Sequence, residues 1–235
     1  MIRSIVRGLA VCGVALAAVA MFSGRGSSSA ATVLPAATLG GGLATAPGEE
    51  VAILSGGCFW GVQAVFQHMN GVASAISGYT GGSVKNPGYE QVSTGTTGHA
   101  ESVRVTFDPS KVSYADLLRV FFSVATDPTE LNYQGPDHGT QYRSVIWYTT
   151  DAQKNVAKSY IDQLAKAKTY SNKIVTEVKP AQEFFNAEGY HQDYATLHPD
   201  NGYIAINDAP KVANLKRLFP ALYRDQPVLV GSTQP

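Results

Sequence analysis

Residues 51–71, VAILSGGCFWGVQAVFQHMNG, contain the pattern that decides the fold of this chain. The short apolar run from Val51 to Ser55 predicts a buried strand that stops at two glycines. Beyond the glycines, apolar residues recur at helical spacing until Gly71 ends the pattern. The segment therefore predicts a strand, a tight turn and a helix, with Cys58 at the turn.

The pattern continues with alternating strands and helices on the C-terminal side. Residues 101–107 alternate with the period of a half-buried strand, and Ser113 with Asp116 resembles a capping box at the start of a helix. Further strands are expected at residues 72–79, 144–148 and 174–178, and further helices at 151–168 and 211–218. This order predicts an α+β protein, a ferredoxin-like sandwich with helices on one face of the sheet and long loops around the cysteine.

The first fifty residues differ from the rest of the chain. Arg3 and Arg7 precede an apolar run that ends near Phe22, and small residues follow up to Ala31, which is the pattern of an export signal. An uncleaved membrane anchor is the alternative, and both place the protein outside the cytoplasm, in the periplasm or anchored facing it. We expect an export signal or anchor at 1–31, a flexible linker at 32–49, the folded domain at 50–224 and a tail at 225–235.

Composition narrows the class of partner. The 235 residues carry 18 basic and 18 acidic side chains, so no net field favours nucleic acid, and a neutral substrate and a monomer are expected. The five histidines lack the helical spacing of metal ligands, and only one cysteine lies outside the export segment. We therefore expect neither a metal nor an organic cofactor.

Cys58 is the residue best placed for chemistry. The positive end of a helix dipole and its free amide groups favour a thiolate over a thiol. Gly57 and Gly61 leave room for a substrate near the backbone, and Phe59 and Trp60 could line a pocket for an apolar methyl group. The alternative for an isolated cysteine is a buried structural role, against which the two aromatic neighbours argue.

Several separated motifs resemble one known family, the peptide methionine sulfoxide reductase A family. The similarity extends from Val51 to Leu197 and is highly specific, because the motifs occur in the family's order. They are GGCFWG at 56–61, GYTGG at 78–82, NPGYEQV at 86–92, GTTGHAE at 95–101, FDP at 107–109 and QGPDHGTQYRS at 134–144.

The resemblance implies a role for each candidate residue. It makes Cys58 the nucleophile, Glu101 the acid that protonates the sulfoxide oxygen, and Tyr89 and Tyr142 hydroxyl donors to that oxygen. It also implies that Asp137 is a polar residue beside the site, and that Phe59 and Trp60 bind the methyl group, with Gly57 beside them.

Physical chemistry supports these roles, because a sulfoxide is a poor electrophile until its oxygen is protonated. A glutamate in an apolar pocket can have a pKa high enough to donate a proton near neutral pH, and phenol hydroxyls can stabilise developing charge. Each residue also has a plain structural alternative: Glu101 as an exposed strand residue, Asp137 as a turn former and the tyrosines as loop aromatics.

The family implies thiol-dependent reduction of methionine S-sulfoxide, peptide-bound and free, in the repair of oxidised envelope proteins, with a sulfenic acid on Cys58 as intermediate. Many members carry further cysteines near the C-terminus, and none follows Cys58 here. The reductant is therefore expected to be an external thiol or a thioredoxin- or glutaredoxin-like protein. The alternatives are a one-cysteine thiol peroxidase and a module that only binds oxidised methionine.

Overall fold

A computed structural model describes residues 31–232, and a six-stranded sheet lies at its centre. The strands are ordered β7-β6-β1-β3-β2-β8, and all neighbours are antiparallel except β6 and β7. Their bounds are β1 Glu50–Gly56, β2 Val72–Thr80, β3 Ala100–Phe107, β6 Ser144–Tyr148, β7 Glu177–Pro180 and β8 Phe184–Asn186. Strands β4 Tyr133–Gln134 and β5 Asp137–His138 form a separate small hairpin.

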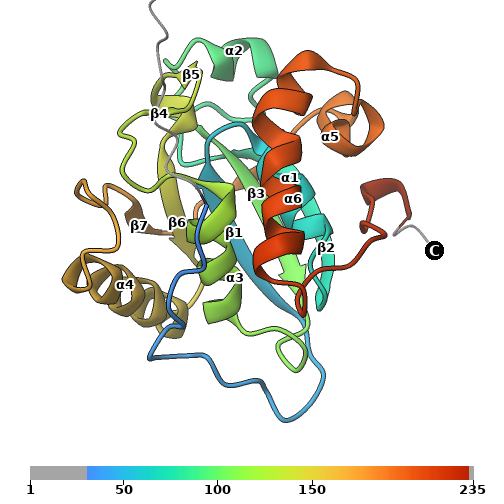
Figure 1. Ribbon diagram of the computed structural model, residues 1–235. Helices are drawn as coiled ribbons and strands as arrows, with labels where there is room; N and C mark the ends of the chain where they lie inside the picture. Colours follow the sequence, from blue (N-terminus) through green and yellow to red (C-terminus); the bar gives the residue numbers. More distant parts are fainter. Residues whose placement is uncertain (1–30, 233–235) are drawn as a thin grey trace, which may run out of the picture.

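The four central strands confirm the expected ferredoxin-like α+β arrangement. In β1-α1-β2 and in β3-α3-β6, the two strands of each unit are separated by one strand of the other unit, as in a split βαβ pair. Helices α1 Phe59–Gln67, α3 Tyr114–Val120, α4 Asp151–Lys166 and α6 Ala209–Leu218 contribute to the same large core, and Figure 1 shows α3 and α6 in front of the sheet. The long loops beyond one end of the sheet carry the short helices α2 Tyr89–Ser93 and α5 Tyr194–Leu197.

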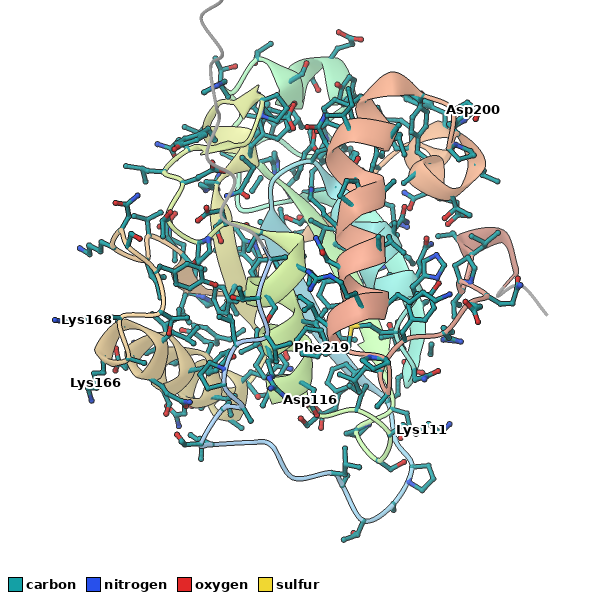
Figure 2. All side chains as sticks on the ribbon, viewed as in Figure 1. Lys111, Asp116, Lys166, Lys168, Asp200 and Phe219 are labelled. Atoms are coloured by element: carbon teal, nitrogen blue, oxygen red, sulfur yellow. The ribbon has the colours of Figure 1, made fainter. Side chains whose placement is uncertain are left out.

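The alternation in β3 determines what faces the helices. Val103, Val105 and Phe107 are buried in the main core. Glu101 lies on the same face of the strand and is also buried, at 3% exposure. Charged side chains such as Lys111, Lys166 and Asp200 lie at the periphery (Figure 2). The sequence pattern thus places one carboxyl group on the helix-covered face of the sheet.

Helix starts follow local side-chain chemistry. The expected capping box opens α3, because Ser113 Oγ accepts from the Asp116 amide at 3.1 Å and Asp116 Oδ2 accepts from the Ser113 amide at 3.3 Å. The helix then widens into the π-helix η1, Phe121–Ala125, whose residues are all buried. At α4 the cap is Thr150, whose Oγ1 accepts from the Gln153 amide at 3.2 Å.

Two elements near the C-terminus differ from the sequence prediction. The strand expected at residues 174–178 begins only at Glu177, and its parallel pairing with β6 runs from there to Pro180. The edge strand β8 was not predicted, because three residues are too few to show an alternating pattern. The helix expected at 211–218 extends back to Ala209 and is preceded by the π-helix η4, Ile204–Asp208.

The segment expected to be a flexible linker is partly packed in the structure. It contains no helix or strand before Glu50, but Leu34 is only 2% exposed and belongs to the main core. Arg119 donates to the Leu34 carbonyl at 2.7 Å, and the Tyr160 hydroxyl donates to the Pro35 carbonyl at 2.8 Å. Figure 1 shows this segment, in blue, passing α3 and α4 before it turns back into β1. Burial of Leu34, these two bonds and others such as that from the Thr38 amide to Gln163 Oε1 therefore hold a segment whose composition alone predicts no packing.

The two chain ends bear on the expected domain limits. Of the export signal or anchor expected at 1–31, residues 1–30 lie outside the described residues. Within residues 31–232, no helix combines the length and the apolar character that crossing a membrane requires. At the other end, the Val228 amide donates to the Gln67 carbonyl at 3.1 Å, so the beginning of the expected tail contacts α1.

Candidate active site

Cys58 lies between the end of β1 and the first turn of α1. Gly57 adopts a φ of +94°, and a Cβ there would collide with the side chain of Gln134, so this bend requires glycine. Cys58 is the N-cap residue of α1, with no side-chain capping bond, and its side chain is 8% exposed and not in a disulfide. The turn therefore presents a thiol at a helix start, as the sequence predicts.

Glu101 reaches the same place from the neighbouring strand. β3 pairs with β1, and Glu101 Oε2 accepts a hydrogen bond of 3.0 Å from the amide of Phe59, the first residue of α1. Burial raises the pKa of the Glu101 carboxyl to about 8, although the Phe59 amide partly opposes this shift. A buried carboxyl group with a raised pKa therefore lies at the start of α1, next to Cys58.

The thiolate expected at Cys58 is not favoured in the resting protein. Burial raises the Cys58 pKa well above its ordinary value, and the nearby carboxylates of Glu101 and Asp208 raise it further. The Trp60 amide, at the helix start, and Lys211 lower it, but they do not outweigh the burial. The amide at the helix start lowers the Cys58 pKa, as predicted from the sequence. The predicted net direction of the pKa shift was wrong, because burial by elements far away in the sequence has the larger effect.

Three further residues predicted for the site lie near Cys58 and Glu101. Tyr89 begins α2, Tyr142 ends the 3₁₀ turn η2 at Thr140–Tyr142, and Asp137 begins β5. Burial raises the pKa of both tyrosines, and the charge of Glu101 raises them further, with a smaller effect from Cys58. The charge of Asp137 in turn raises the pKa of Glu101. Polar groups from two segments, α2 and residues 137–142, therefore lie near the Cys58 and Glu101 side chains.

The two aromatic residues after Cys58 have different surroundings. Phe59 is 1% exposed, with its ring centroid 5.1 Å from that of His191, so it packs inside the domain. Trp60 is half-buried, stacks on Tyr194 at 4.0 Å between centroids, and donates from Nε1 to His191 Nδ1 at 3.2 Å. The Trp60 ring is thus held on two sides, with an edge-on contact to Tyr203 at 6.0 Å.

Sequence reasoning missed several residues that the C-terminal part of the chain brings to the site. The Tyr203 hydroxyl donates to Asp137 Oδ2, and the charge of Cys58 is among the causes that raise the Tyr203 pKa, after burial. Asp208, fully buried, bonds Lys211 at 3.1 Å through Oδ1, while its Oδ2 has no partner among the described residues. A Cβ at Gly61 would collide with the Asp208 carboxylate. Only the i, i+3 spacing of Asp208 and Lys211 was visible in the sequence.

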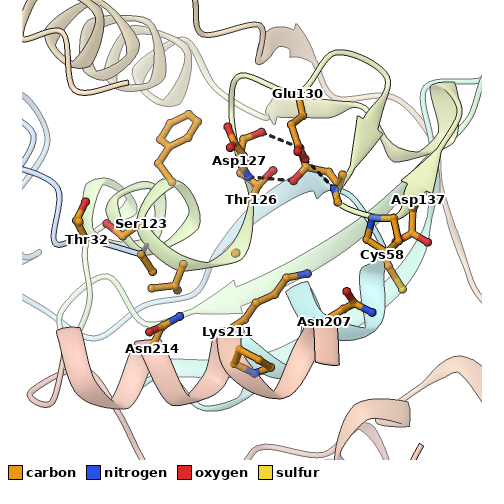
Figure 3. A pocket seen from close by; sticks show the side chains of 18 of the residues that line it. Thr32, Cys58, Ser123, Thr126, Asp127, Glu130, Asp137, Asn207, Lys211 and Asn214 are labelled. Atoms are coloured by element: carbon orange, nitrogen blue, oxygen red, sulfur yellow. Dashed lines mark hydrogen bonds between the residues drawn. The ribbon is translucent and has the colours of Figure 1, made fainter. Parts of the chain in front are cut away.

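A groove of about 650 Å³ opens beside Cys58 (Figure 3). One wall comes from residues 122–127 and 134–137, and the other from Tyr203 and the first turns of α6. Figure 3 shows Lys211 extending from α6 into the groove, across from Asp127 and Glu130. Within residues 31–232, no group of three or more histidine, cysteine, aspartate or glutamate side chains is arranged to hold a metal ion.

Comparisons with known proteins agree on one family. The family model described as peptide methionine sulfoxide reductase matches residues 50–221. Peptide methionine sulfoxide reductase MsrA 2 of Mesorhizobium japonicum is 63% identical over 187 residues, covering 80% of this chain and 96% of its own. The enzyme named MsrA from Polynucleobacter asymbioticus is 49% identical over 77% of this chain and 94% of its own.

Solved structures give the same result. Reduced Mxr1 from Saccharomyces cerevisiae superposes with a TM-score of 0.59 at 32% identity, covering 69% of this chain and 91% of its own. Methionine sulfoxide reductase A of Corynebacterium diphtheriae superposes with a TM-score of 0.55 at 35% identity, covering 66% of this chain and 77% of its own. Both structures share the α+β architecture described above.

Proposed function

The chain belongs to the peptide methionine sulfoxide reductase family, and we propose that Cys58 and Glu101 together carry out the reduction. The reaction of the family returns oxidised methionine to methionine, and this chain is an oxidoreductase of that kind. The observation that carries the assignment of residues is the bond from the Phe59 amide to Glu101 Oε2, which fixes a buried acid next to the thiol.

In the proposed first step, neutral Glu101 donates its proton to the sulfoxide oxygen while the Cys58 sulfur attacks the sulfoxide sulfur. The carboxylate left behind accepts the thiol proton, so a thiol whose pKa is raised can still react as a nucleophile. The hydroxyls of Tyr89 and Tyr142 bind the same oxygen as it becomes basic. The attack joins the two sulfurs, and this S–S bond breaks as the protonated oxygen moves to the Cys58 sulfur, so the products are methionine and Cys58 sulfenic acid.

Selectivity for the methyl end of the substrate is assigned to Trp60, with Phe59 behind it. Trp60 is held by His191 and Tyr194 and is half-buried, so its ring offers an apolar surface near the thiol. Asp137, bonded to Tyr203, supplies a polar group at the same site. The proposed substrate is the S epimer of methionine sulfoxide, either within a peptide or as the free amino acid.

Regeneration of Cys58 requires thiols from outside the chain. Cys12 is the other cysteine of the sequence and lies in the segment proposed as an export signal or anchor. An external thiol, or a thioredoxin- or glutaredoxin-like protein, therefore reduces the sulfenic acid through a mixed disulfide. The same segment supports an extracytoplasmic location, where oxidised envelope proteins would be the substrates.

A comparison of substrates and variants tests this function. The wild-type protein should consume S-sulfoxide of a methionine peptide in the presence of dithiothreitol and should leave the R epimer unchanged. Cys58→Ser should bind the peptide but show no turnover. Faster consumption of hydrogen peroxide than of the sulfoxide would instead support a thiol peroxidase, and turnover by Cys58→Ser would contradict the proposed nucleophile.

A further inference from the structure

The groove beside Cys58 offers an approach to its sulfur. Figure 3 shows Cys58 at one end of the groove, and Leu34, Tyr170 and Arg217 are among the other residues that line it. Among the described residues that line it, Glu101, Tyr89 and Tyr142 are absent, although all three influence or surround the thiol. The sulfur is therefore reachable from a side that does not carry the groups proposed to bind the sulfoxide oxygen.

The chemistry of a sulfenic acid makes this second side useful. Displacement at a divalent sulfur proceeds in line with the bond that breaks, so an incoming thiol attacks opposite to the departing oxygen. In the proposed function that oxygen lies with Glu101 and the two tyrosines. An attacking thiol therefore needs an open route from a different side, and the groove provides one.

The walls of the groove carry charges of both signs. Lys211 extends from α6 opposite Asp127 and Glu130, and Arg217 of the same helix also lines the groove. The volume of about 650 Å³ is within the range of roughly 300–1,000 Å³ that is usual for small-ligand sites. A ligand with carboxylate and ammonium groups matches this arrangement better than an apolar one.

We propose that the groove admits the reducing thiol, a small peptide thiol with carboxylate and ammonium groups, to Cys58 sulfenic acid. This inference rests on the proposed function, because that function creates the sulfenic acid. The thiol sulfur bonds to the Cys58 sulfur, the S–O bond breaks, and the hydroxyl group leaves as water with one proton from Glu101, whose carboxylate then takes up the proton of the thiol. A second thiol then releases Cys58 as a thiol and leaves as the symmetric disulfide.

The structure suggests a matched pair of variants on one helix. Asn214 is a half-buried residue of α6 that lines the groove at some distance from Cys58, and Figure 3 shows its amide facing the groove. Asn214→Trp should fill the groove. Ala213→Trp is the matched control, because it places the same side chain on the preceding residue, which is exposed and lines a different pocket.

The two half-reactions are measured separately. Reduced protein is first mixed with a methionine sulfoxide peptide without thiol, and methionine formation is timed. The resulting sulfenic acid is then mixed with glutathione as the probe, and its loss is timed by dimedone trapping. Both variants should match the wild-type rate of the first half-reaction, whereas Asn214→Trp should slow the second by about tenfold or more.

A second variant keeps the proposal testable if the bulky side chain disturbs folding. Arg217 is an exposed residue of α6 that lines the groove, so Arg217→Gln should fold normally. It should raise the glutathione concentration needed for half-maximal reduction, while reduction by uncharged dithiothreitol stays unchanged.

Three results distinguish the possibilities. Wild-type kinetics with glutathione in both Asn214→Trp and Arg217→Gln would overturn the proposed route. Loss of the first half-reaction in Asn214→Trp, with a peptide but not with free methionine sulfoxide, would overturn it too and assign the groove to the substrate chain. Absence of methionine in the wild-type first half-reaction would mean that the proposed function itself has failed.

Discussion

Glu101 Oε2 lies 3.0 Å from the backbone nitrogen of Phe59, and this hydrogen bond ties the acid of one strand to the helix start that carries the thiol. The bond uses one carboxyl oxygen and leaves the other for a reacting group. It also links two elements, β3 and α1, that adjoin in the core. The distance between acid and nucleophile is thereby set by the sheet and not by a loop.

The rate of sulfoxide reduction should depend on the protonation of Glu101. Because burial raises the Glu101 pKa to about 8, the carboxyl is neutral at neutral pH and loses its proton above that value. Single-turnover methionine formation should therefore decrease by about tenfold per pH unit on the alkaline side. Single-turnover assays with excess enzyme, quenched at set times at several alkaline pH values, measure this decrease in rate.

Glu101→Gln is the control for that pH dependence. Glutamine can donate a hydrogen bond but no proton, so the rate should fall by roughly 10² to 10⁴-fold and the alkaline limb near Glu101's pKa should disappear. A glutamine variant that keeps the wild-type limb would assign the titration to another group, such as Cys58.

The same carboxyl should influence stability. The folded state holds its proton up to a pKa of about 8, whereas the ordinary value is 4.5, so between these values the folded state binds more protons than the unfolded state. The contribution of protonated Glu101 to the free energy of unfolding is complete below pH 4.5 and is lost as the pH rises towards 8. Urea unfolding should show that Glu101→Gln becomes progressively more stable relative to wild type over this range. Parallel stability curves for the two proteins would contradict the raised pKa.

Tyr89 and Tyr142 should act through their hydroxyl groups. Replacing either with phenylalanine keeps the ring and removes one donor to the sulfoxide oxygen, so the first half-reaction should slow by roughly 10²-fold. Tyr190→Phe is the matched control, because that residue is 62% exposed and should keep the wild-type rate. Equal rates in all three variants would remove the tyrosines from the proposed chemistry.

Leu34 should contribute to stability although it precedes the sheet. It is 2% exposed, so Leu34→Ala should lower the free energy of unfolding by about 2–5 kcal/mol. Leu39 lies in the same segment at 46% exposure, and Leu39→Ala should change the value by less than about 0.5 kcal/mol. Equal effects of the two substitutions in denaturant unfolding would show that the segment is a linker, as its composition suggests.

These sites show which features a sequence can predict. The strand, turn and helix around Cys58 and the buried face of β3 follow from local periodicity and from glycine, and both were predicted. Tyr203 and Asp208 reach the site only because the chain returns after β8, which no local pattern encodes. The balance of charge and burial at Cys58 likewise depends on Glu101 and Asp208, so the helix start alone predicted the wrong direction of its pKa shift.

The most direct test of the account is a single turnover without any reducing thiol. Reduced protein is mixed with one equivalent of a methionine S-sulfoxide peptide, and the products are examined by mass spectrometry after dimedone trapping. The account predicts one methionine peptide per protein and dimedone on Cys58 in the same proportion. Methionine formed while Cys58 remains a free thiol would contradict it.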